Sequence, residues 1–184
     1  VKNHAYLQED DLPIFMSKLE QYDGNSLTKL AVKFILYTFV RTSELRFAVW
    51  DEVDLDGISP IWKIPSERMK MKRPHYVPLV PQTIQLLDEV RTLKNSKDFI
   101  FPSQKNIRKA MSENTLLYAL YRMGYHSRTT VHGFRSTAST VLNESRKWHP
   151  DVIERQLAHV EGNKVRAAYN HAEYLDERRE MMQW

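Results

Sequence analysis

The segment that most constrains the fold of this chain is a predicted helix that is apolar on nearly every side. Between Leu27 and Val40, apolar residues recur at helical spacing on one face, and further apolar residues fill much of the opposite face. Because a helix that is apolar all round must be enclosed by other elements, we expect this segment to lie at the centre of the domain.

Helical patterns dominate the rest of the chain. The residues Glu9-Asp10-Asp11-Leu12-Pro13 are typical of a helix start, with acidic side chains in the first turn and an early proline. Further helices are predicted over 43–49, 81–93, 112–123, 132–145, 150–157, 163–169 and 173–184.

The pattern changes to a period of two in the middle of the chain. Apolar residues alternate with polar ones over 53–55, 61–64 and 75–79, with Asp56-Gly57 as a turn after the first stretch. This alternation predicts three short antiparallel strands. The expected fold class is therefore mainly α with a small antiparallel β-sheet (α+β).

The composition limits the domain organisation and the chemistry. The 184 residues suit one domain, hold no cysteine, and contain no apolar run long enough to span a bilayer. Without cysteine, disulfides, thiolate nucleophiles and Cys-based zinc sites are excluded. Because the chain starts without Met and stops in a predicted helix, we interpret it as a fragment of a longer protein.

Positive charge is concentrated in the predicted strand region. The net charge is +4, which points weakly to a polyanionic partner. Six basic side chains fall within thirteen residues: Lys63, Arg68, Lys70, Lys72, Arg73 and His75. Such a run is either a solvated face or a phosphate-binding surface, and composition alone leaves both open.

Four short motifs carry residues that could perform chemistry. They are TFVRTSEL with Arg41 and Glu44, HGFR with His132 and Arg135, QLAH with His159, and AAYNH with Tyr169. His132 and Arg135 share one face of a predicted helix whose other face is apolar. Taken singly, each motif also has an ordinary structural explanation, such as an ion pair or a core tyrosine.

Taken in order, the motifs resemble the tyrosine recombinases, the integrase family. The order is Arg-x-x-Glu-Leu, a Lys in a hairpin before Val-Pro-Leu, His-x-x-Arg, Leu-x-His, and a Tyr ten residues later. The segment RMKMKRPHYVPL looks closest to integrases of prophages, satellite phages and genomic islands. The resemblance implies that 1–184 is one catalytic domain, and that the longer protein also has core-binding and arm-binding domains.

The resemblance also implies a role for each motif residue. Arg41 and Arg135 would bind the scissile phosphate, Glu44 would orient Arg41, His132 would act as base, His159 would add a phosphate hydrogen bond, and Tyr169 would be the nucleophile. Family hairpins usually place the lysine eight residues before the proline, which selects Lys70 as the general acid; Lys72, Arg73 and Arg68 would contact DNA.

The chain departs from the family pattern at three points. Phe39 and Ala158 stand where glycine is common, and both changes would preserve the geometry if these residues are helical. The interval from His159 to Tyr169 is ten residues where nine is commoner, so Tyr174 is a second candidate nucleophile.

The tail over 173–184 is expected to dock in trans on a neighbouring protomer. Its apolar residues, Tyr174, Leu175, Met181 and Met182, have no evident partner within the chain. No metal or cofactor is expected, because His132, His159 and His171 lack the i,i+4 pairing of a helical metal site.

The implied function is site-specific recombination of DNA through a 3′-phosphotyrosine intermediate, without metal or ATP. The implied partners are duplex attachment sites, a homotetramer assembled on DNA, and accessory DNA-bending or directionality proteins. The implied location is the bacterial cytoplasm at the nucleoid, with no membrane. The alternatives are a type IB topoisomerase, a DNA-binding module that has lost catalysis and, with least support, a metal-dependent nuclease.

Overall fold

The structure, a computed structural model, describes residues 5–93, 96–159 and 172–184. Its α-helices are α1 (Leu12–Glu20), α2 (Ser26–Thr38), α3 (Thr42–Arg46), α4 (Pro81–Thr92), α5 (Thr115–Arg122), α6 (Gly133–Ser145), α7 (Pro150–Gln156) and α9 (Leu175–Gln183). Short 3-10 helices cover Glu9–Asp11, Trp50–Glu52 and Ser66–Arg68. The predicted helix over 163–169 lies outside the described residues.

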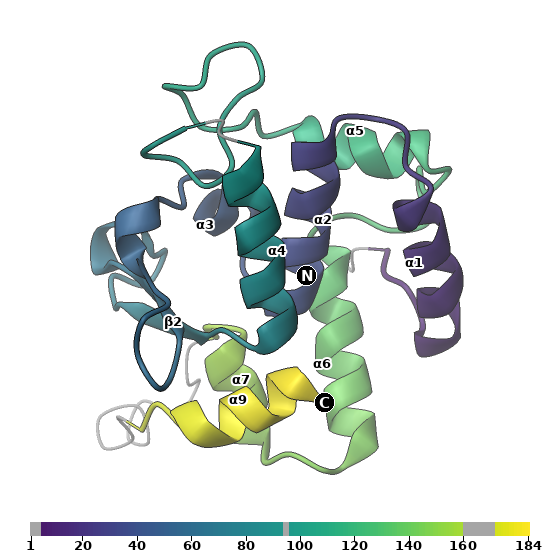
Figure 1. Cartoon of the computed structure of the whole chain (residues 1–184). Helices are drawn as coiled ribbons and strands as arrows, with labels where there is room; N and C mark the ends of the chain where they lie inside the picture. The colour runs from purple at the N-terminus through teal and green to yellow at the C-terminus, as the bar shows by residue number, and fades with distance from the viewer. Residues whose placement is uncertain (1–4, 94–95, 160–171) are drawn as a thin grey trace.

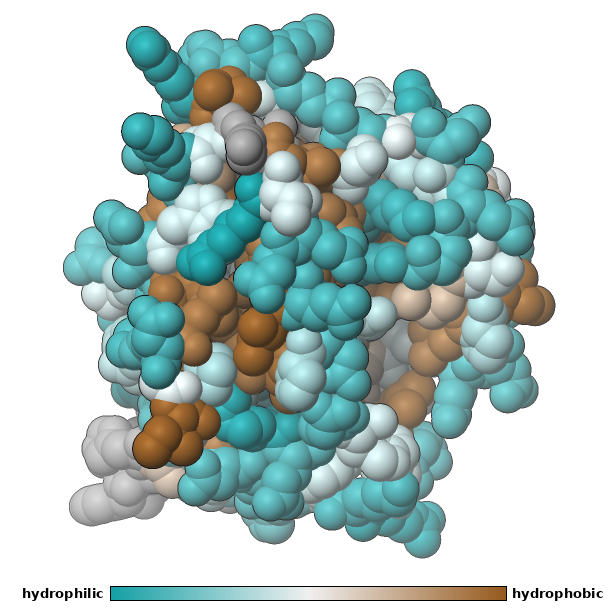
Figure 2. Space-filling model, in the orientation of Figure 1, coloured by the Kyte–Doolittle hydropathy of each residue, from teal (hydrophilic) through white to brown (hydrophobic). Residues whose placement is uncertain are grey.

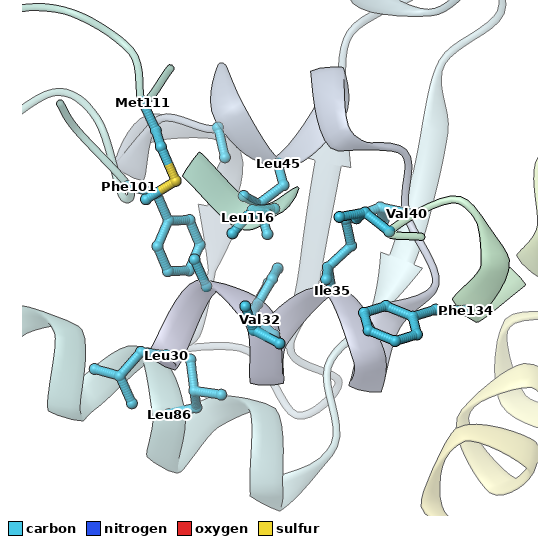
Figure 3. Close-up of a cluster of buried hydrophobic side chains, with 14 of the residues drawn as sticks. Leu30, Val32, Ile35, Val40, Leu45, Leu86, Phe101, Met111, Leu116 and Phe134 are labelled. Atoms are coloured by element: carbon cyan, nitrogen blue, oxygen red, sulfur yellow. The ribbon is translucent and has the colours of Figure 1, made fainter. Parts of the chain in front are cut away.

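Helix α2 lies at the centre, as predicted. It begins after Asn25, whose side chain accepts the Thr28 N–H at 3.2 Å, and it packs against both α4 and α5. Figure 3 shows its side chains leaving in different directions: Leu30 meets Leu86 of α4, whereas Val32 points toward Leu116 of α5. The helix is therefore enclosed on several sides, which explains its near-continuous apolar sequence.

The three predicted strands form one antiparallel sheet in the order β1-β2-β3. The strands are β1 (Val53–Asp54), β2 (Ile61–Ile64) and β3 (His75–Pro78). Trp62 pairs with Val77 across β2 and β3, and both are buried, whereas Lys63 between the buried positions of β2 is exposed. The prediction of a mainly helical fold with a small antiparallel sheet is confirmed.

A second, smaller core joins α6, α7 and α9. It consists of Leu142, Val152, Ile153, Leu157 and Met181, with Phe39, Trp148, Tyr174 and Met182 packed against it. Figure 1 shows α9 lying across α7 and beside the lower end of α6. The expectation that the tail's apolar residues lack a partner within the chain is therefore wrong: Met181 is only 2% exposed.

The face drawn in Figure 2 is mostly hydrophilic, with hydrophobic residues showing in patches between polar side chains. Within the ranges that the structure describes, none of the helices has the length and apolar character needed to cross a bilayer.

Candidate active site

The C-terminal end of α2 forms one side of the candidate site. Phe39 follows the last helical residue in the left-handed conformation, with φ 55° and ψ 21°, and its N–H donates to the Ile35 carbonyl at 2.9 Å. This turn ends the helix, and carbonyls in the last turn of a helix lack partners within it. The Phe39 carbonyl instead accepts a hydrogen bond from Nη1 of Arg135.

The C-terminal end of α7 forms the other side in the same way. Ala158 has φ 48°, and the His159 N–H reaches back to the Glu154 carbonyl at 3.0 Å. The Leu157 carbonyl accepts Nη2 of Arg135, and the next carbonyl, that of Ala158, accepts Nη2 of Arg41 at 3.0 Å. Because helix C-termini carry partial negative charge, two helix ends hold the two guanidiniums close together.

Phe39 and Ala158 are not helical, so the condition under which their change from glycine would preserve the geometry is not met. Both have positive φ, a conformation that costs an L-residue about 1–2 kcal/mol and that glycine adopts without this cost. The Ala158 carbonyl accepts a hydrogen bond from Arg41, and the Phe39 carbonyl accepts one from Arg135. A glycine at either position would therefore serve the same geometry at lower cost.

The strain at Ala158 leads to a prediction. Ala158→Gly is expected to raise the free energy of unfolding by up to about 1 kcal/mol, which corresponds to about 2–4 °C in Tm for a domain of this size. The control is Ala119→Gly in the middle of α5, where the residue is helical and buried and glycine should destabilise. Thermal unfolding followed by circular dichroism measures both variants. Destabilisation by Ala158→Gly would contradict the prediction.

Arg41 is held by Glu44, as the sequence suggested. Glu44 is 2% exposed; its carboxylate accepts the Arg41 backbone N–H at 2.6 Å and Nη1 of Arg41 at 2.7 Å. Arg41 keeps 22% of its side chain exposed. One buried carboxylate thus fixes both the backbone and the guanidinium of Arg41.

Arg135 is more deeply placed than its helical position indicated. We expected it on an exposed polar face beside His132, but it is only 5% exposed. Burial first, and then the charge of Arg41, lower the pKa of Arg135 to about 10, so it remains charged at neutral pH. Its bonds to Phe39 and Leu157 use only part of its five N–H donors, and Nε has no partner among the described residues. Donors therefore remain for an oxyanion.

The two histidines lie at helix ends on exposed positions. His132 is the residue before α6, and the next residue must be small, because a Cβ at Gly133 would lie 2.2 Å from the Ala5 carbonyl oxygen. His159 directly follows Ala158, and its Nδ1 lies 2.8 Å from Oε2 of Glu154. His159 is thus adjacent in the chain to a carbonyl that binds Arg41.

The hairpin loop between Ser66–Arg68 and β3 exposes Lys70, Lys72 and Arg73. Arg68 differs, since its Nη1 donates to the Glu44 carbonyl at 3.2 Å and its Nη2 forms an ion pair with Glu52. Arg68 therefore joins the base of the hairpin to α3, and the DNA contact predicted for it stays a prediction.

Tyr169 and His171 lie outside the described residues, so the structure does not place the predicted nucleophile. Tyr174, the second candidate, packs against the small core of α6, α7 and α9.

His75 also departs from the sequence interpretation. It belongs to the basic run, yet it is 4% exposed. Burial, followed by the charges of Arg178 and Arg135, holds the pKa of His75 well below its ordinary value. This histidine is therefore neutral and adds no charge to the basic surface.

A buried polar network that joins α9, α7 and the end of α2 was missed by the sequence interpretation. Arg178 of α9 is 0% exposed and donates to Oε1 of Gln156 through Nε at 3.0 Å and Nη2 at 2.9 Å. Gln156 in turn donates from Nε2 to the Thr38 carbonyl at 2.9 Å. Arg178 and Gln156 lie in helices whose periodicity comes from their apolar residues. The only indication of this network in the sequence was therefore that both residues are polar.

The architecture is shared with solved recombinase structures. The XerH site-specific recombinase bound to difH substrate matches with a TM-score of 0.70 and 19% identity, covering 96% of this chain and 54% of that chain. The lambda integrase catalytic core matches with a TM-score of 0.59 and 16% identity, covering 87% of this chain and 94% of that chain. The fold is that of a tyrosine recombinase catalytic domain.

Sequence comparison gives the family. The phage integrase family profile matches residues 5–175, and the chain belongs to this family. The integrase of Enterobacteria phage P4 is 46% identical over 198 residues, covering 100% of this chain and 45% of the phage protein. The integrase of Shigella phage Sf6 is 40% identical over 184 residues, with 100% and 47% covered. The chain therefore spans about half the length of these relatives.

Proposed function

We propose that residues 1–184 are the catalytic domain of a site-specific DNA recombinase that integrates or excises a prophage or genomic island. The observation that carries this proposal is the pairing of Arg41 and Arg135, which lie far apart in the sequence but bind the consecutive carbonyls of Ala158 and Leu157. Two guanidiniums held this close repel each other, as the effect of Arg41 on the pKa of Arg135 shows. Such a pair suits an anionic ligand between or beside them.

A phosphodiester is the anion that this arginine pair suits best. Its negative oxygens repel nucleophiles, so cleavage requires positive charge that is already in place where charge develops. A guanidinium is planar, always charged and able to direct two donors at non-bridging oxygens. Arg41 and Arg135 would bind these oxygens, and His159 would add a hydrogen bond from the end of α7.

The nucleophile in this proposal is Tyr169. Because an unperturbed tyrosine has a pKa of about 10, its proton must be removed as it attacks, and His132 would accept it. The products are a 3′-phosphotyrosyl bond and a free 5′-hydroxyl. Since the phosphotyrosyl bond conserves the energy of the broken phosphodiester, rejoining requires no ATP, and the arginines supply the charge without a metal.

The relatives support duplex DNA and self-association as features of the whole protein. Among the related structures, XerH is bound to difH substrate, and lambda integrase forms a tetramer bound to a Holliday junction. We therefore propose attachment-site DNA as substrate and a homotetramer on DNA, acting in the bacterial cytoplasm at the nucleoid. Accessory DNA-bending or directionality proteins belong to the same proposal.

The test is covalent capture on a nicked suicide substrate. The wild-type protein should form an adduct that survives a denaturing gel, and the full-length protein should exchange strands between two attachment sites. Relaxation of supercoiled DNA without strand exchange would favour the topoisomerase alternative. DNA binding with no adduct would favour the silent DNA-binding module.

The hairpin lysine can be identified by its chemistry. A general acid is needed only if the leaving oxygen requires a proton, and a 5′-thiolate leaving group does not. We expect Lys70→Ala to cleave ordinary DNA slowly but the 5′-thio substrate at close to the wild-type rate. Single-turnover cleavage of both substrates measures this rescue.

Lys72→Ala is the matched control, because Lys72 is exposed in the same loop. It should weaken DNA binding with a shallower salt dependence, as expected for a lost phosphate contact, and show no selective rescue by sulfur. Rescue of Lys72→Ala alone would assign the acid to Lys72.

Docking of the tail in trans remains a proposal for the protein assembled on DNA. In the single chain, the segment before α9 is held in cis by an ion pair between Arg155 and Glu173. Residues 1–184 contain no cysteine, so in a full-length protein whose other cysteines have been replaced, Arg155→Cys with Glu173→Cys can be joined selectively by a short bis-maleimide. In the full-length protein, joining should preserve the suicide-substrate adduct but reduce strand exchange. Unchanged strand exchange would refute trans docking.

A further inference from the structure

Glu154, in the last turn of α7, contacts one of the predicted catalytic residues. The left-handed Ala158 lets the His159 N–H fold back to the Glu154 carbonyl at 3.0 Å. The same turn brings the imidazole over the carboxylate, with Nδ1 2.8 Å from Oε2. The backbone and side chain of His159 are thus both held by Glu154.

The chemistry of this pair fixes the proton on His159. The hydrogen bond from His159 is the largest cause that lowers the pKa of Glu154, and the charge of Arg135 acts in the same direction. Glu154 is therefore ionised at neutral pH, and an ionised carboxylate only accepts hydrogen bonds. Nδ1 must then carry the proton that is shared with Glu154. Nε2 is therefore the ring nitrogen that can face a ligand.

We propose that Glu154 is a positioning residue for His159, holding Nδ1–H so that Nε2 is directed at the phosphate bound by Arg41 and Arg135. This rests on the proposed function, because it takes a phosphodiester as the ligand. With Nδ1–H committed to Glu154, Nε2 donates to a phosphate oxygen only when the ring is an imidazolium. In that form the ring places an N–H donor beside the two arginines.

The geometry of the turn explains why this position suits the task. A histidine at the end of α7 without a partner would be free to rotate, since 42% of its side chain is exposed. Glu154 restricts the ring from within the same helix, which also supplies the Leu157 and Ala158 carbonyls for the arginines. One helix end therefore orients three of the phosphate-binding groups.

The first experiment compares Glu154→Gln with wild type on the suicide substrate. The adduct should form about 10- to 100-fold more slowly, as expected for loss of one charge-assisted hydrogen bond, with unchanged DNA affinity. The matched control is Glu144→Gln, the same charge change at an exposed position of α6, which should react at the wild-type rate. A wild-type rate for Glu154→Gln would overturn the proposal.

The second experiment separates positioning from a general structural effect. If Glu154 acts only through His159, Glu154→Gln should cause no further loss in a His159→Ala background. An additional loss of the same size in that background would overturn the proposal.

The third measurement does not depend on catalysis. Nitrogen-15 chemical shifts of the His159 ring at high pH should place the remaining proton on Nδ1 in the wild type and move it toward Nε2 in Glu154→Ala. A wild-type proton on Nε2 would overturn the proposal even if the enzyme is active. A proton on Nδ1 in a wild-type protein that forms no adduct would instead overturn the proposed function alone.

Discussion

Tyr169→Phe is expected to abolish the covalent adduct with a suicide substrate while leaving DNA binding intact. The phenylalanine ring keeps nearly the same volume but has no oxygen with which to attack phosphorus. The arginines and hairpin lysines that we propose as phosphate contacts are unchanged, so affinity should be preserved. A denaturing gel measures the adduct, and a mobility shift at matched salt measures binding.

Tyr174→Phe is the control for this prediction. Tyr174 precedes α9 and packs against the core of Leu142, Val152, Ile153 and Leu157. Its phenylalanine variant should therefore form the adduct at the wild-type rate. If the adduct persisted in Tyr169→Phe and disappeared in Tyr174→Phe, the nucleophile would be Tyr174.

Arg135→Ala is expected to slow adduct formation by at least about 100- to 1000-fold, the loss typical of one preorganised donor at a developing oxyanion. It should also destabilise the domain, because the carbonyls of Phe39 and Leu157 would both lose a partner, at about 1–3 kcal/mol for each buried group left unpaired. Arg135→Lys keeps the charge but not the planar fork, so most of the rate loss should remain.

Arg179→Ala separates the catalytic effect of Arg135 from its structural effect. Nη1 of Arg179 donates to the carbonyls of Pro60 at 3.0 Å and Leu79 at 2.9 Å, so its removal also takes a donor from two carbonyls, although the Pro60 carbonyl still accepts the Leu79 N–H. We expect a loss of Tm but an adduct rate within a few-fold of wild type when both variants are assayed well below their unfolding temperatures. A similar rate loss in both variants would attribute the effect of Arg135 to stability.

The sequence determined the elements that depend on local pattern. The apolar residues of α2 predicted a central helix because helical periodicity and all-round burial are both visible in one segment. The alternation of apolar and polar residues over 53–79 predicted β1, β2 and β3, because this pattern is also visible within each short segment. The ordered motifs also selected Arg41, Glu44 and Arg135, because residue types and their spacing can be read directly from the sequence without knowing the tertiary contacts.

The tertiary structure decided how these residues meet. The burial of Arg135 depends on carbonyls of Phe39 and Leu157, 96 and 22 residues away in the sequence, and no local periodicity encodes such a contact. The positive φ of Phe39 and Ala158 was hidden because neither residue is the glycine that usually marks this conformation. The folding of α9 onto the chain's own core likewise depends on packing between distant helices.

Local propensity and spacing therefore determined which residues are available for chemistry and which elements carry them. Only tertiary packing determined which helix ends face each other. The carbonyls at those helix ends accept hydrogen bonds from the arginines. The direction in which these carbonyls point depends on the orientation of whole helices.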